Sequence, residues 1–506
     1  MTLDFSPSEV TLTELQAALQ AGHLTSEALI AHYLARIEAI DHDGPTLKAV
    51  LEINPEAPAL AAQSDRERRN GRLRGPLHGL PVLLKGNIDT ADQMSTTAGS
   101  LALQGRRAPQ DAFLVERLRA AGAILLGKTN LSEWAKFRSK DSTSGWSSQG
   151  GQTRNPYALD RNPSGSSSGS AVAVAADLCP LAVGTETDGS IVSPAGANGI
   201  VGLKPTLGLI SRAGIIPIAH SQDTAGPMAR TVKDAAWLLG ALVGVDARDP
   251  ATGNSLSQAH SDYTQFCRAD GLRGARLGVV RSYFGQDRRV DALMEEALAA
   301  LQAAGAIVVE SELRASAEYA QSEWQVLLYE FKAGLNHYLA RTGPDAPVRT
   351  LADLIAFNEK ERATVMPYFA QDIFVAAEAK GPLTEAAYLT ALADNRRLSR
   401  SEGIDRALQA QALEALIAPT NGPAWLTDYV NGDCYRLSSS SPAAVAGYPS
   451  LTVPLGQVWG LPVGITFFGA AYSEPALIRL AYAFEQITQA RRPPHFRPIV
   501  DLAAGA

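Results

Sequence analysis

The chain has 506 residues, of which 46% are hydrophobic and 19% are charged, and its formal net charge is −7. This length allows either several ordinary domains or one large domain. No cluster of lysine and arginine dominates any segment, so the composition argues against nucleic-acid binding. No apolar run reaches 18 residues, so no membrane-spanning helix and no membrane partner are predicted.

The cysteines and the N-terminal residues bear on the cellular compartment. Cys179, Cys267 and Cys434 are odd in number and far apart, which is typical of a reduced protein rather than of a disulfide scaffold. The first ten residues, MTLDFSPSEV, lack the basic and apolar regions of a signal peptide. We therefore expect a cytoplasmic protein, and a periplasmic form processed from a longer precursor stays open.

The first predicted elements are two helices within residues 11–41. Thr11 and Glu14 have the spacing of a capping box, and the apolar residues that follow Ser26 recur at intervals of three and four. Residues 81–84 then read as a short apolar strand that ends at Lys85. A lysine that closes a buried strand is uncommon because desolvating an ammonium group is costly, although a lysine can also reach water with its long side chain.

Residues 111–127 predict a helix followed by a strand. Gly122, Gly127, Lys128 and Thr129 fit the G-x-x-x-x-G-K-T expression of a nucleotide-binding loop. The residues between the two glycines are Ala-Ile-Leu-Leu, and these belong to the predicted strand. A phosphate-binding loop must follow its strand, so we reject nucleotide binding.

Helix and strand patterns alternate through much of the chain, which predicts an α/β fold with a largely parallel sheet. We see no internal repeat and no low-complexity linker, so one domain that spans residues 1–506 is predicted. Its parts are N-terminal helices (1–70), a core (71–310), a helix-rich segment that shapes the substrate pocket (311–412) and the C-terminal part of the core (413–506). Further predicted elements are a helix at 229–243, a strand at 274–281, a helix and strand at 291–309, a strand at 415–418, a helix and two strands at 443–469 and a final helix at 475–490.

The stretch 163–205 is predicted to form the floor of an active site. Clusters of glycine and serine around Ser166 and Ser190 flank an apolar run, and such small residues allow tight backbone next to a reacting group. Residues 165–169 also fit the G-x-S-x-G elbow of other hydrolases, with Ser167 as nucleophile. An elbow needs a strand directly before it, and ALDRNPSG precedes this one.

Taken together, these motifs resemble the amidase signature family. Lys85 ends a strand, Ser166 lies in a Gly-Ser-Ser cluster, and Ser190 follows 24 residues later. Further sequence motifs also match the family, so the resemblance spans most of the chain. These motifs are TAGS, TRNP, GLKPT, DTAGPMART, PSLTVPLG and LPVGITFFG. Within the family, GTETDGSIVSPA and GWSSQGGQTRNP are most similar to bacterial peptide amidases, which release ammonia from C-terminal peptide amides.

The resemblance implies an α/β fold with a large central mixed sheet and helices on both faces. It also implies that Ser190 is the nucleophile and that Lys85 is a base that must be neutral. Ser166 would relay protons between them and contact the substrate, and a cis peptide bond is implied at Ser166. No metal and no organic cofactor are expected. The implied oxyanion hole consists of the backbone N–H groups of Thr187, Asp188, Gly189 and Ser190.

The sequence departs from the family pattern at several positions. Asp188 stands where many members have glycine, and an aspartate would fit such a turn with a positive φ. Gly86 replaces a common acidic residue next to the lysine, and Ser164 and Ser168 replace glycines. None of these departures removes a catalytic group, so we expect them to affect substrate choice.

Two other functions stay open at this point. The chain could be the amidase subunit of a tRNA-dependent amidotransferase, which would act within a complex. It could also be a binding protein with an amidase fold and no catalysis, although the joint presence of Lys85, Ser166 and Ser190 argues against this. We expect a monomer or homodimer that acts on a small-molecule or peptide amide, and the sequence does not specify the acyl group.

Overall fold

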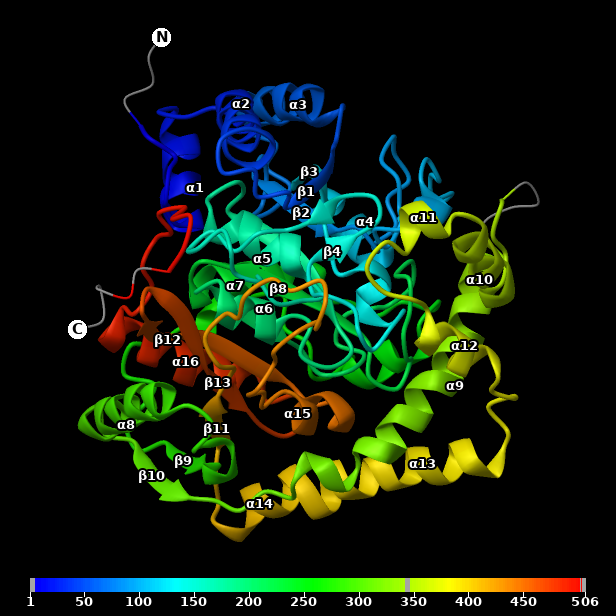
Figure 1. The fold of residues 1–506 in the computed structure, drawn as a ribbon. Coiled ribbons are helices and arrows are strands. Elements are labelled where there is room, and N and C mark those ends of the chain that lie inside the picture. Colours follow the sequence, from blue (N-terminus) through cyan, green and yellow to red (C-terminus); the bar gives the residue numbers. More distant parts are fainter. Residues whose placement is uncertain (1–4, 342–345, 501, 503–506) are drawn as a thin grey trace.

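The computed structural model describes residues 5–341, 346–500 and 502. Strands from the whole length of the chain join in one 11-stranded sheet, which runs through the middle of the molecule (Figure 1). A separate two-stranded sheet consists of β4 (Trp146–Ser147) and β5 (Gly151–Gln152). The strands of the large sheet are β1 (Val50–Ile53), β2 (Pro81–Lys85), β3 (Ile124–Thr129), β6 (Leu181–Glu186), β7 (Val201–Lys204), β8 (Thr224–Ala229), β9 (Arg276–Val279), β10 (Ile307–Glu310), β11 (Ala415–Pro419), β12 (Ser450–Val458) and β13 (Leu461–Phe468).

The order of strands in the large sheet is β1-β3-β2-β6-β8-β7-β12-β13-β11-β9-β10. The pairs β2–β3, β2–β6, β9–β11 and β9–β10 are parallel, and the other neighbours are antiparallel. The prediction of a largely parallel sheet is therefore wrong, and the mixed sheet that the family resemblance implied is confirmed. The two strands predicted within 443–469 are present as β12 and β13, which form a hairpin through Trp459 and Gly460, both with positive φ. The central strands β7 and β8 were not predicted.

Helices cover both faces of this sheet. The helices α5 and α6 pack against one face, while α4, α7, α8 and α16 form a connected group on the other. The two faces follow from the strand order, because β3 and β6 lie on opposite sides of β2 and right-handed crossovers then place α4 and α5 on opposite faces. The bounds of these helices are α4 (Phe113–Ala120), α5 (Ser168–Ala175), α6 (Val192–Ala197), α7 (Val232–Leu242), α8 (Arg288–Ala303) and α16 (Glu474–Thr488).

The remaining helices lie around this body. The two predicted N-terminal helices are present, and Thr11 forms the predicted capping box with Glu14. In Figure 1 the helices of the predicted helix-rich segment extend along the right and lower edges of the molecule, with α9 packed on α12 and α13. The bounds are α1 (Leu12–Ala21), α2 (Ser26–Arg36), α3 (Ala57–Arg69), α9 (Ala320–Leu339), α10 (Leu351–Lys360), α11 (Arg362–Val365), α12 (Asp372–Glu378), α13 (Ala386–Arg396), α14 (Asp405–Ala410) and α15 (Ser441–Ala446).

The nucleotide-binding expression falls on a strand, as predicted. Ile124 to Thr129 form β3, which is buried throughout. The side chain of Lys128 is also buried, and its Nζ donates hydrogen bonds to the carbonyl oxygen of Ile88 and to the hydroxyl group of Thr96. These contacts use the lysine within the protein, which agrees with the rejection of nucleotide binding.

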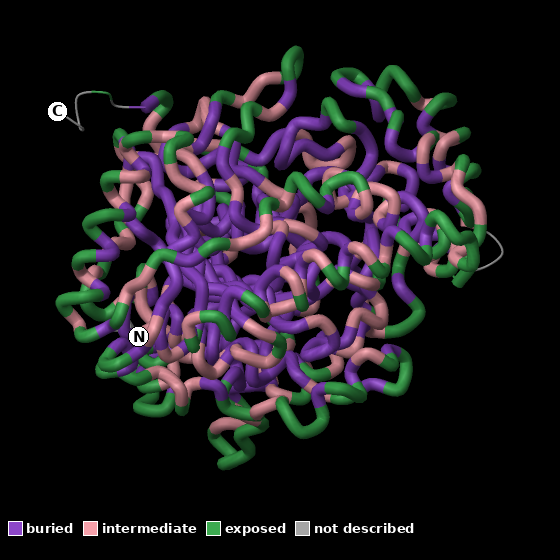
Figure 2. Tube along the Cα trace, turned by 90° about the horizontal axis from the view of Figure 1, so that it is seen from below, coloured by how far each residue is buried: buried purple, intermediate pink, exposed green. Residues whose placement is uncertain are grey.

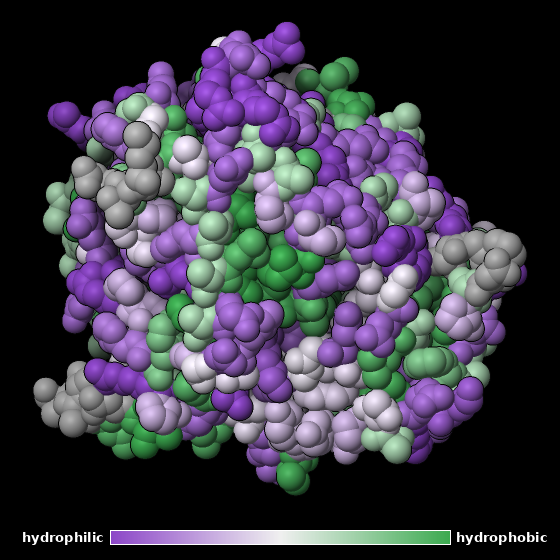
Figure 3. Space-filling model, turned by 90° about the horizontal axis from the view of Figure 1, so that it is seen from above, coloured by the Kyte–Doolittle hydropathy of each residue, from purple (hydrophilic) through white to green (hydrophobic). Residues whose placement is uncertain are grey.

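The interior of the molecule is apolar and its surface is mixed. Buried residues gather at the centre, with half-buried and exposed residues around them (Figure 2). The face seen from above has a hollow of hydrophobic side chains with hydrophilic side chains around it (Figure 3). Within the described residues, no helix has both the length and the apolar character needed to cross a membrane. Cys179, Cys267 and Cys434 are all free.

Candidate active site

Lys85 is the last residue of β2 and is fully buried. The parallel strands β2 and β6 pair with Leu84 opposite Val183, so their carboxyl ends meet at the same edge of the sheet. At this edge the Nζ atom of Lys85 lies 2.9 Å from Oγ1 and 3.1 Å from the carbonyl oxygen of Thr185. The predicted strand-end lysine therefore points into the protein and does not reach water.

Ser166 lies in the loop before α5, and its Oγ atom is 2.7 Å from the Nζ atom of Lys85. A cis peptide bond joins Gly165 to Ser166, as the family resemblance implied. The helix α5 holds this loop close to the core, because its small residues allow close packing. An added Cβ at Gly169 would lie 2.2 Å from the carbonyl oxygen of Ala49, so only glycine fits there.

Ser190 lies in the turn between β6 and α6, and it is 9% exposed. The carboxylate of Glu186 accepts hydrogen bonds from the backbone N–H groups of residues 191 and 192, at 2.7 and 3.0 Å. The backbone N–H group of Ser167 donates to the carbonyl oxygen of Ser190 at 3.1 Å. These bonds fix the turn on both sides of its proposed nucleophile.

Ser166 and Ser190 line the same cavity, which has a volume of about 480 Å³. Their side chains make no direct hydrogen bond with each other among the interactions of the described residues. The structure thus brings Lys85, Ser166 and Ser190 together and forms the first contact of the proposed relay, from lysine to Ser166. The second contact of the proposed relay, between the two hydroxyl groups, is not among the hydrogen bonds of the described residues.

The turn that carries the proposed oxyanion hole has backbone N–H groups that are available to bind a substrate. Within the described part of the chain, the backbone N–H groups of residues 187–190 donate no hydrogen bond to another residue. Buried N–H groups without a partner are rare in proteins, so a row of them beside a serine can serve a bound oxyanion. The turn requires glycine at one position, because Gly189 has a φ of +79°.

The expectation of a positive φ at Asp188 is wrong, since the left-handed residue of this turn is Gly189. The neighbouring glycine takes up the unusual backbone conformation, so Asp188 keeps an ordinary one. Its side chain accepts hydrogen bonds from the hydroxyl groups of Ser440 at 2.5 Å and Ser441 at 2.7 Å. Asp188 is therefore held in place as a wall of the cavity.

Burial lowers the pKa of Lys85 to about 7, and the charges of Glu186 and Asp223 offset this only in part. A neutral amine has two N–H donors and one lone pair. The two oxygen atoms of Thr185 can accept both N–H groups, which leaves the lone pair for the hydroxyl proton of Ser166. The geometry suits a lysine that takes a proton from Ser166.

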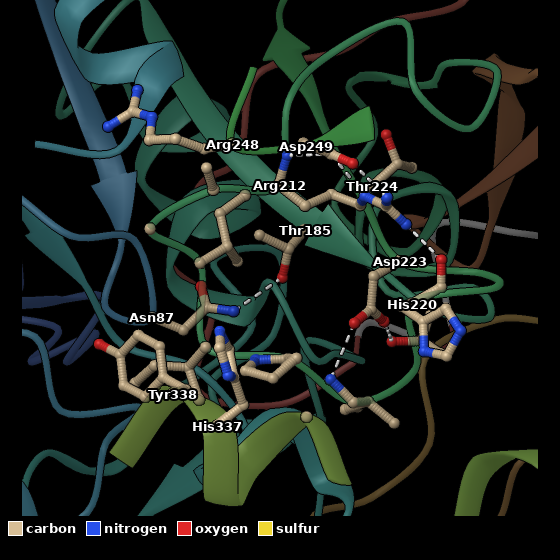
Figure 4. Close-up of a pocket in the computed structure, with 18 of the residues that line it drawn as sticks. Asn87, Thr185, Arg212, His220, Asp223, Thr224, Arg248, Asp249, His337 and Tyr338 are labelled. Carbon is tan, nitrogen blue, oxygen red and sulfur yellow. Dashed lines mark hydrogen bonds and ion pairs between the residues drawn. The ribbon is translucent and has the colours of Figure 1, made fainter. Parts of the chain in front are cut away.

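A second cavity of about 370 Å³ lies on the lysine side of the site (Figure 4). It reaches Thr185, whose hydroxyl group also accepts a hydrogen bond from the Nδ2 atom of Asn87 at 3.0 Å. Asp223 in its wall accepts hydrogen bonds from the hydroxyl group of Thr187 and from the backbone of residues 218 and 219. The proposed oxyanion turn thus stands between the two cavities.

The structure explains one departure from the family pattern and shows an unusual backbone conformation at another. An added Cβ at Gly86 would lie 3.1 Å from both the side chain of Leu51 and the carbonyl oxygen of Thr129, so the core here leaves little room for an acidic side chain. Ser164 has a φ of +62° and lines the cavity, in a conformation that glycine would adopt more easily.

The rival nucleophile Ser167 does not fit its role. It is fully buried, its hydroxyl group donates to the carbonyl oxygen of Thr185 at 3.0 Å, and it accepts a hydrogen bond from the backbone N–H group of the same residue. The preceding strand, β5, ends at Gln152, so no strand of the described residues leads directly into this turn. Ser167 connects the loop to β6 and does not open into the cavity.

Several residues of the site were not predicted from the sequence. Thr185 and Glu186 are polar residues at the end of a buried strand. Polar residues at such a position are the feature of the sequence that could have identified them as part of the site. Glu323 and Trp324 line the cavity from α9, within the segment that we expected to shape the pocket. Among the described residues, no group of histidine, cysteine, aspartate and glutamate could hold a metal ion.

Comparison with known proteins identifies the family. The Amidase family model matches residues 28–478. A structure of the peptide amidase PAM with the competitive inhibitor chymostatin is 57% identical with a TM-score of 0.95, and covers 97% of this chain and 100% of its own. Native peptide amidase from Stenotrophomonas maltophilia is 56% identical with a TM-score of 0.92, over 96% and 99% of the two chains.

Two relatives known from sequence broaden the comparison. A probable amidase from Arabidopsis thaliana is 43% identical and covers 97% of this chain and 92% of its own. A glutamyl-tRNA(Gln) amidotransferase subunit from Chloroflexus aurantiacus is 36% identical, over 95% and 97% of the two chains. The chain therefore belongs to the amidase signature family and is an enzyme that hydrolyses amide bonds.

Proposed function

We propose that this enzyme hydrolyses the C-terminal amides of peptides and releases ammonia, with Ser190, Ser166 and Lys85 as its catalytic residues. The observation that carries the catalytic part is the 2.7 Å contact between the buried Nζ of Lys85 and the hydroxyl group of Ser166. A lysine in this environment accepts a proton near neutral pH, because burial lowers its pKa to about 7.

In the proposed reaction, Ser190 attacks the carbonyl carbon of the amide, and its proton passes through Ser166 to Lys85. The N–H groups of residues 187–190 stabilise the oxyanion that forms. The proton then returns through Ser166 to the departing nitrogen, and ammonia leaves. Water attacks the acyl-enzyme by the same relay, which yields the carboxylic acid and restores Ser190.

The peptide part of the proposal depends on the shape of the cavity and on the comparisons. The lining of the cavity combines many polar side chains with an apolar and aromatic part, which includes Trp324, Leu327, Trp425 and Tyr435. Such a wall suits the side chains of a peptide that leads up to its terminal amide. The 57% identity to a peptide amidase exceeds the 36% identity to an amidotransferase subunit, which supports the same choice.

The amidotransferase subunit is the second candidate, because the similarity to that protein covers 95% of this chain. The two functions differ in their need for a partner. A peptide amidase works alone, whereas an amidotransferase subunit acts within a complex.

The experiment that separates these functions measures ammonia released by the purified chain. The substrates are amidated peptides, simple aliphatic amides, aryl amides and glutamine. We expect rapid turnover of peptide amides without any partner. Turnover of the simple amides alone would contradict the peptide assignment, and no turnover of any amide without a partner would favour the amidotransferase. Labelling of Ser190 by a fluorophosphonate probe would exclude a non-catalytic binding protein.

A further inference from the structure

Three carboxyl groups line the catalytic cavity: Asp433 pairs with Lys136, and the proposed reaction leaves Asp188 and Glu323 without a role. Asp188 is two residues before Ser190, and Glu323 lies in the first turn of α9. Both line the cavity that also contains Ser166 and Ser190. Glu323 is buried and Asp188 is half-buried, and an acidic residue is costly at a buried site, so the pair calls for an explanation beyond packing.

The surroundings favour a different protonation state for each member of the pair. Asp188 accepts hydrogen bonds from two hydroxyl groups, those of Ser440 and Ser441, which suits a carboxylate. Glu323 accepts one hydrogen bond, from the Nε2 atom of Gln222 at 3.0 Å. Burial and the neighbouring charge of Asp188 raise the pKa of Glu323 well above its usual range. A side-chain hydrogen bond joins Glu323 to Asp188, and two carboxyl groups that share such a bond need one proton between them. The direction of the pKa shift places this proton on Glu323, so its O–H group donates to Asp188.

Gln222 connects this pair to the catalytic turn. Its Nε2 atom also donates to the carbonyl oxygen of Thr187 at 3.3 Å, so one side chain joins Glu323 to the turn that carries Ser190. Asp188 is itself part of that turn. The single negative charge that the pair carries is thus held next to the position where the carbonyl group of a substrate must bind.

The basic residues of the cavity are engaged elsewhere. Lys136 pairs with Asp433, and the Nζ atom of Lys140 lies 5.1 Å from the ring centroid of Trp324. The amine of Lys85 lies behind Ser166, and burial lowers its pKa to about 7. None of these lysines forms an ion pair with Asp188 or Glu323 among the described residues, so they do not neutralise the charge of the pair within the cavity.

We propose that Asp188 and Glu323 form one singly charged pair that keeps carboxylates from binding beside Ser190, so that the enzyme distinguishes a terminal amide from a terminal acid. The amide is neutral, whereas the acid product carries a negative charge where the pair already places one. Like charges repel strongly at a few ångströms in a site shielded from water. The same repulsion promotes release of the acid after hydrolysis. This inference rests on the proposed function, since it assumes that amides bind in this cavity.

The test measures binding to the Ser190→Ala enzyme, which removes turnover and lets the amide and the acid be compared at equilibrium. The probes are an N-acylated dipeptide amide and the matching N-acylated dipeptide acid, and calorimetry gives both dissociation constants. We expect the acid to bind at least about tenfold more weakly than the amide. Equal affinities would overturn the proposal before any further variant is made.

Two further variants in the same background identify the charge. Glu323→Gln is the matched control, because its amide can donate to Asp188 and accept from Gln222 as the protonated acid does. We expect the ratio of the acid and amide dissociation constants to stay within about twofold of the ratio for Ser190→Ala alone. Asp188→Asn combined with Glu323→Gln removes the charge, and we expect acid affinity to rise at least about tenfold relative to amide affinity.

Each other result contradicts the inference. A ratio that persists in the folded double variant would show that the discrimination has another source. A ratio that collapses in Glu323→Gln alone would show that Glu323 carries the charge. Thermal melting checks that each variant is folded, and Asp188→Ser combined with Glu323→Gln replaces the double variant if that one does not fold. The proposed function fails separately, if the wild-type enzyme releases no ammonia from the amide probe.

Discussion

The Nζ atom of Lys85 lies 2.7 Å from the Oγ atom of Ser166, and both side chains are buried. The two residues are 81 positions apart in the chain, one at the end of β2 and the other in the loop before α5. Thr185 accepts the remaining hydrogen bonds of the lysine, so its amine is oriented toward the serine. The predictions on catalysis follow from this contact.

Ser190→Ala is expected to abolish hydrolysis and to leave the fold intact. The substitution removes the proposed nucleophile, and loss of such a group lowers the rate by many powers of ten. We expect less than about 1% of wild-type ammonia release. Circular dichroism would verify the fold. A higher residual rate, with contaminating enzyme excluded, would assign the nucleophile to another residue.

Ser166→Ala is expected to lower kcat by at least about 10²-fold, because it removes the group that connects Lys85 to the nucleophile. Ser170→Ala is the matched control. Ser170 is another buried serine in the same region, and its hydroxyl group lies 2.7 Å from that of Thr129, outside the cavity. The control should lose stability without a comparable loss of kcat. Equal losses of kcat in both variants would indicate a structural role for Ser166.

Gly86→Ala is expected to destabilise the enzyme by about 1–3 kcal/mol, the usual cost of overpacking a core. The added Cβ would meet Leu51 and Thr129 at 3.1 Å. Gly253→Ala is the control, since its Cβ would have nothing within 4 Å. Denaturant unfolding of both variants measures the difference. Equal stability of the two would show that the core around Gly86 yields easily.

Activity is expected to survive dialysis against EDTA. The proposed mechanism uses only side chains and backbone N–H groups of the chain itself. Ammonia release before and after dialysis, and again after addition of zinc, measures any need for a metal. Loss of activity that zinc restores would reveal a metal site that neither the sequence nor the geometry indicated.

The proposed catalytic residues could be named from the sequence because the motifs that contain them resemble those of the amidase signature family. Lys85 ends an apolar strand, and Ser166 and Ser190 lie in clusters of small residues. The strand β2 is present where the sequence predicted it, and both clusters lie in a loop or turn that lines the cavity. The strand end and the two serine clusters are each formed by residues that are adjacent in the chain, so they can be recognised in the sequence.

Other features depend on pairing between distant segments and could not be read in this way. The antiparallel strands at the centre of the sheet come from contacts between β7, β8 and β12, which no local pattern reveals. Glu323 faces Asp188 from a helix more than 100 residues away, and its own sequence context looks like an ordinary helix surface. Gly189 has a positive φ, and an added Cβ there would lie 2.9 Å from the hydroxyl oxygens of Ser193 and Ser440; the second of these contacts comes from a distant segment.

Catalysis is expected to depend on pH through the protonation of Lys85. Only the neutral lysine can accept a proton, and burial lowers its pKa to about 7 from a usual value near 10.5. The neutral form is therefore scarce well below pH 7 and predominates above it. We expect kcat/KM to rise tenfold per pH unit at low pH and to level off above a pKa of about 7.

Substitutions of Lys85 separate a base from a simple positive charge. Lys85→Ala should lose both the rate and the rising limb of the pH profile. Lys85→Arg keeps a positive charge, but guanidinium does not lose its proton in a protein, so this variant should fail as well. A lysine that only held the substrate by its charge would be partly replaced by arginine. Near wild-type turnover by Lys85→Arg would thus exclude the base role, and Ser166 would need another group to accept its proton.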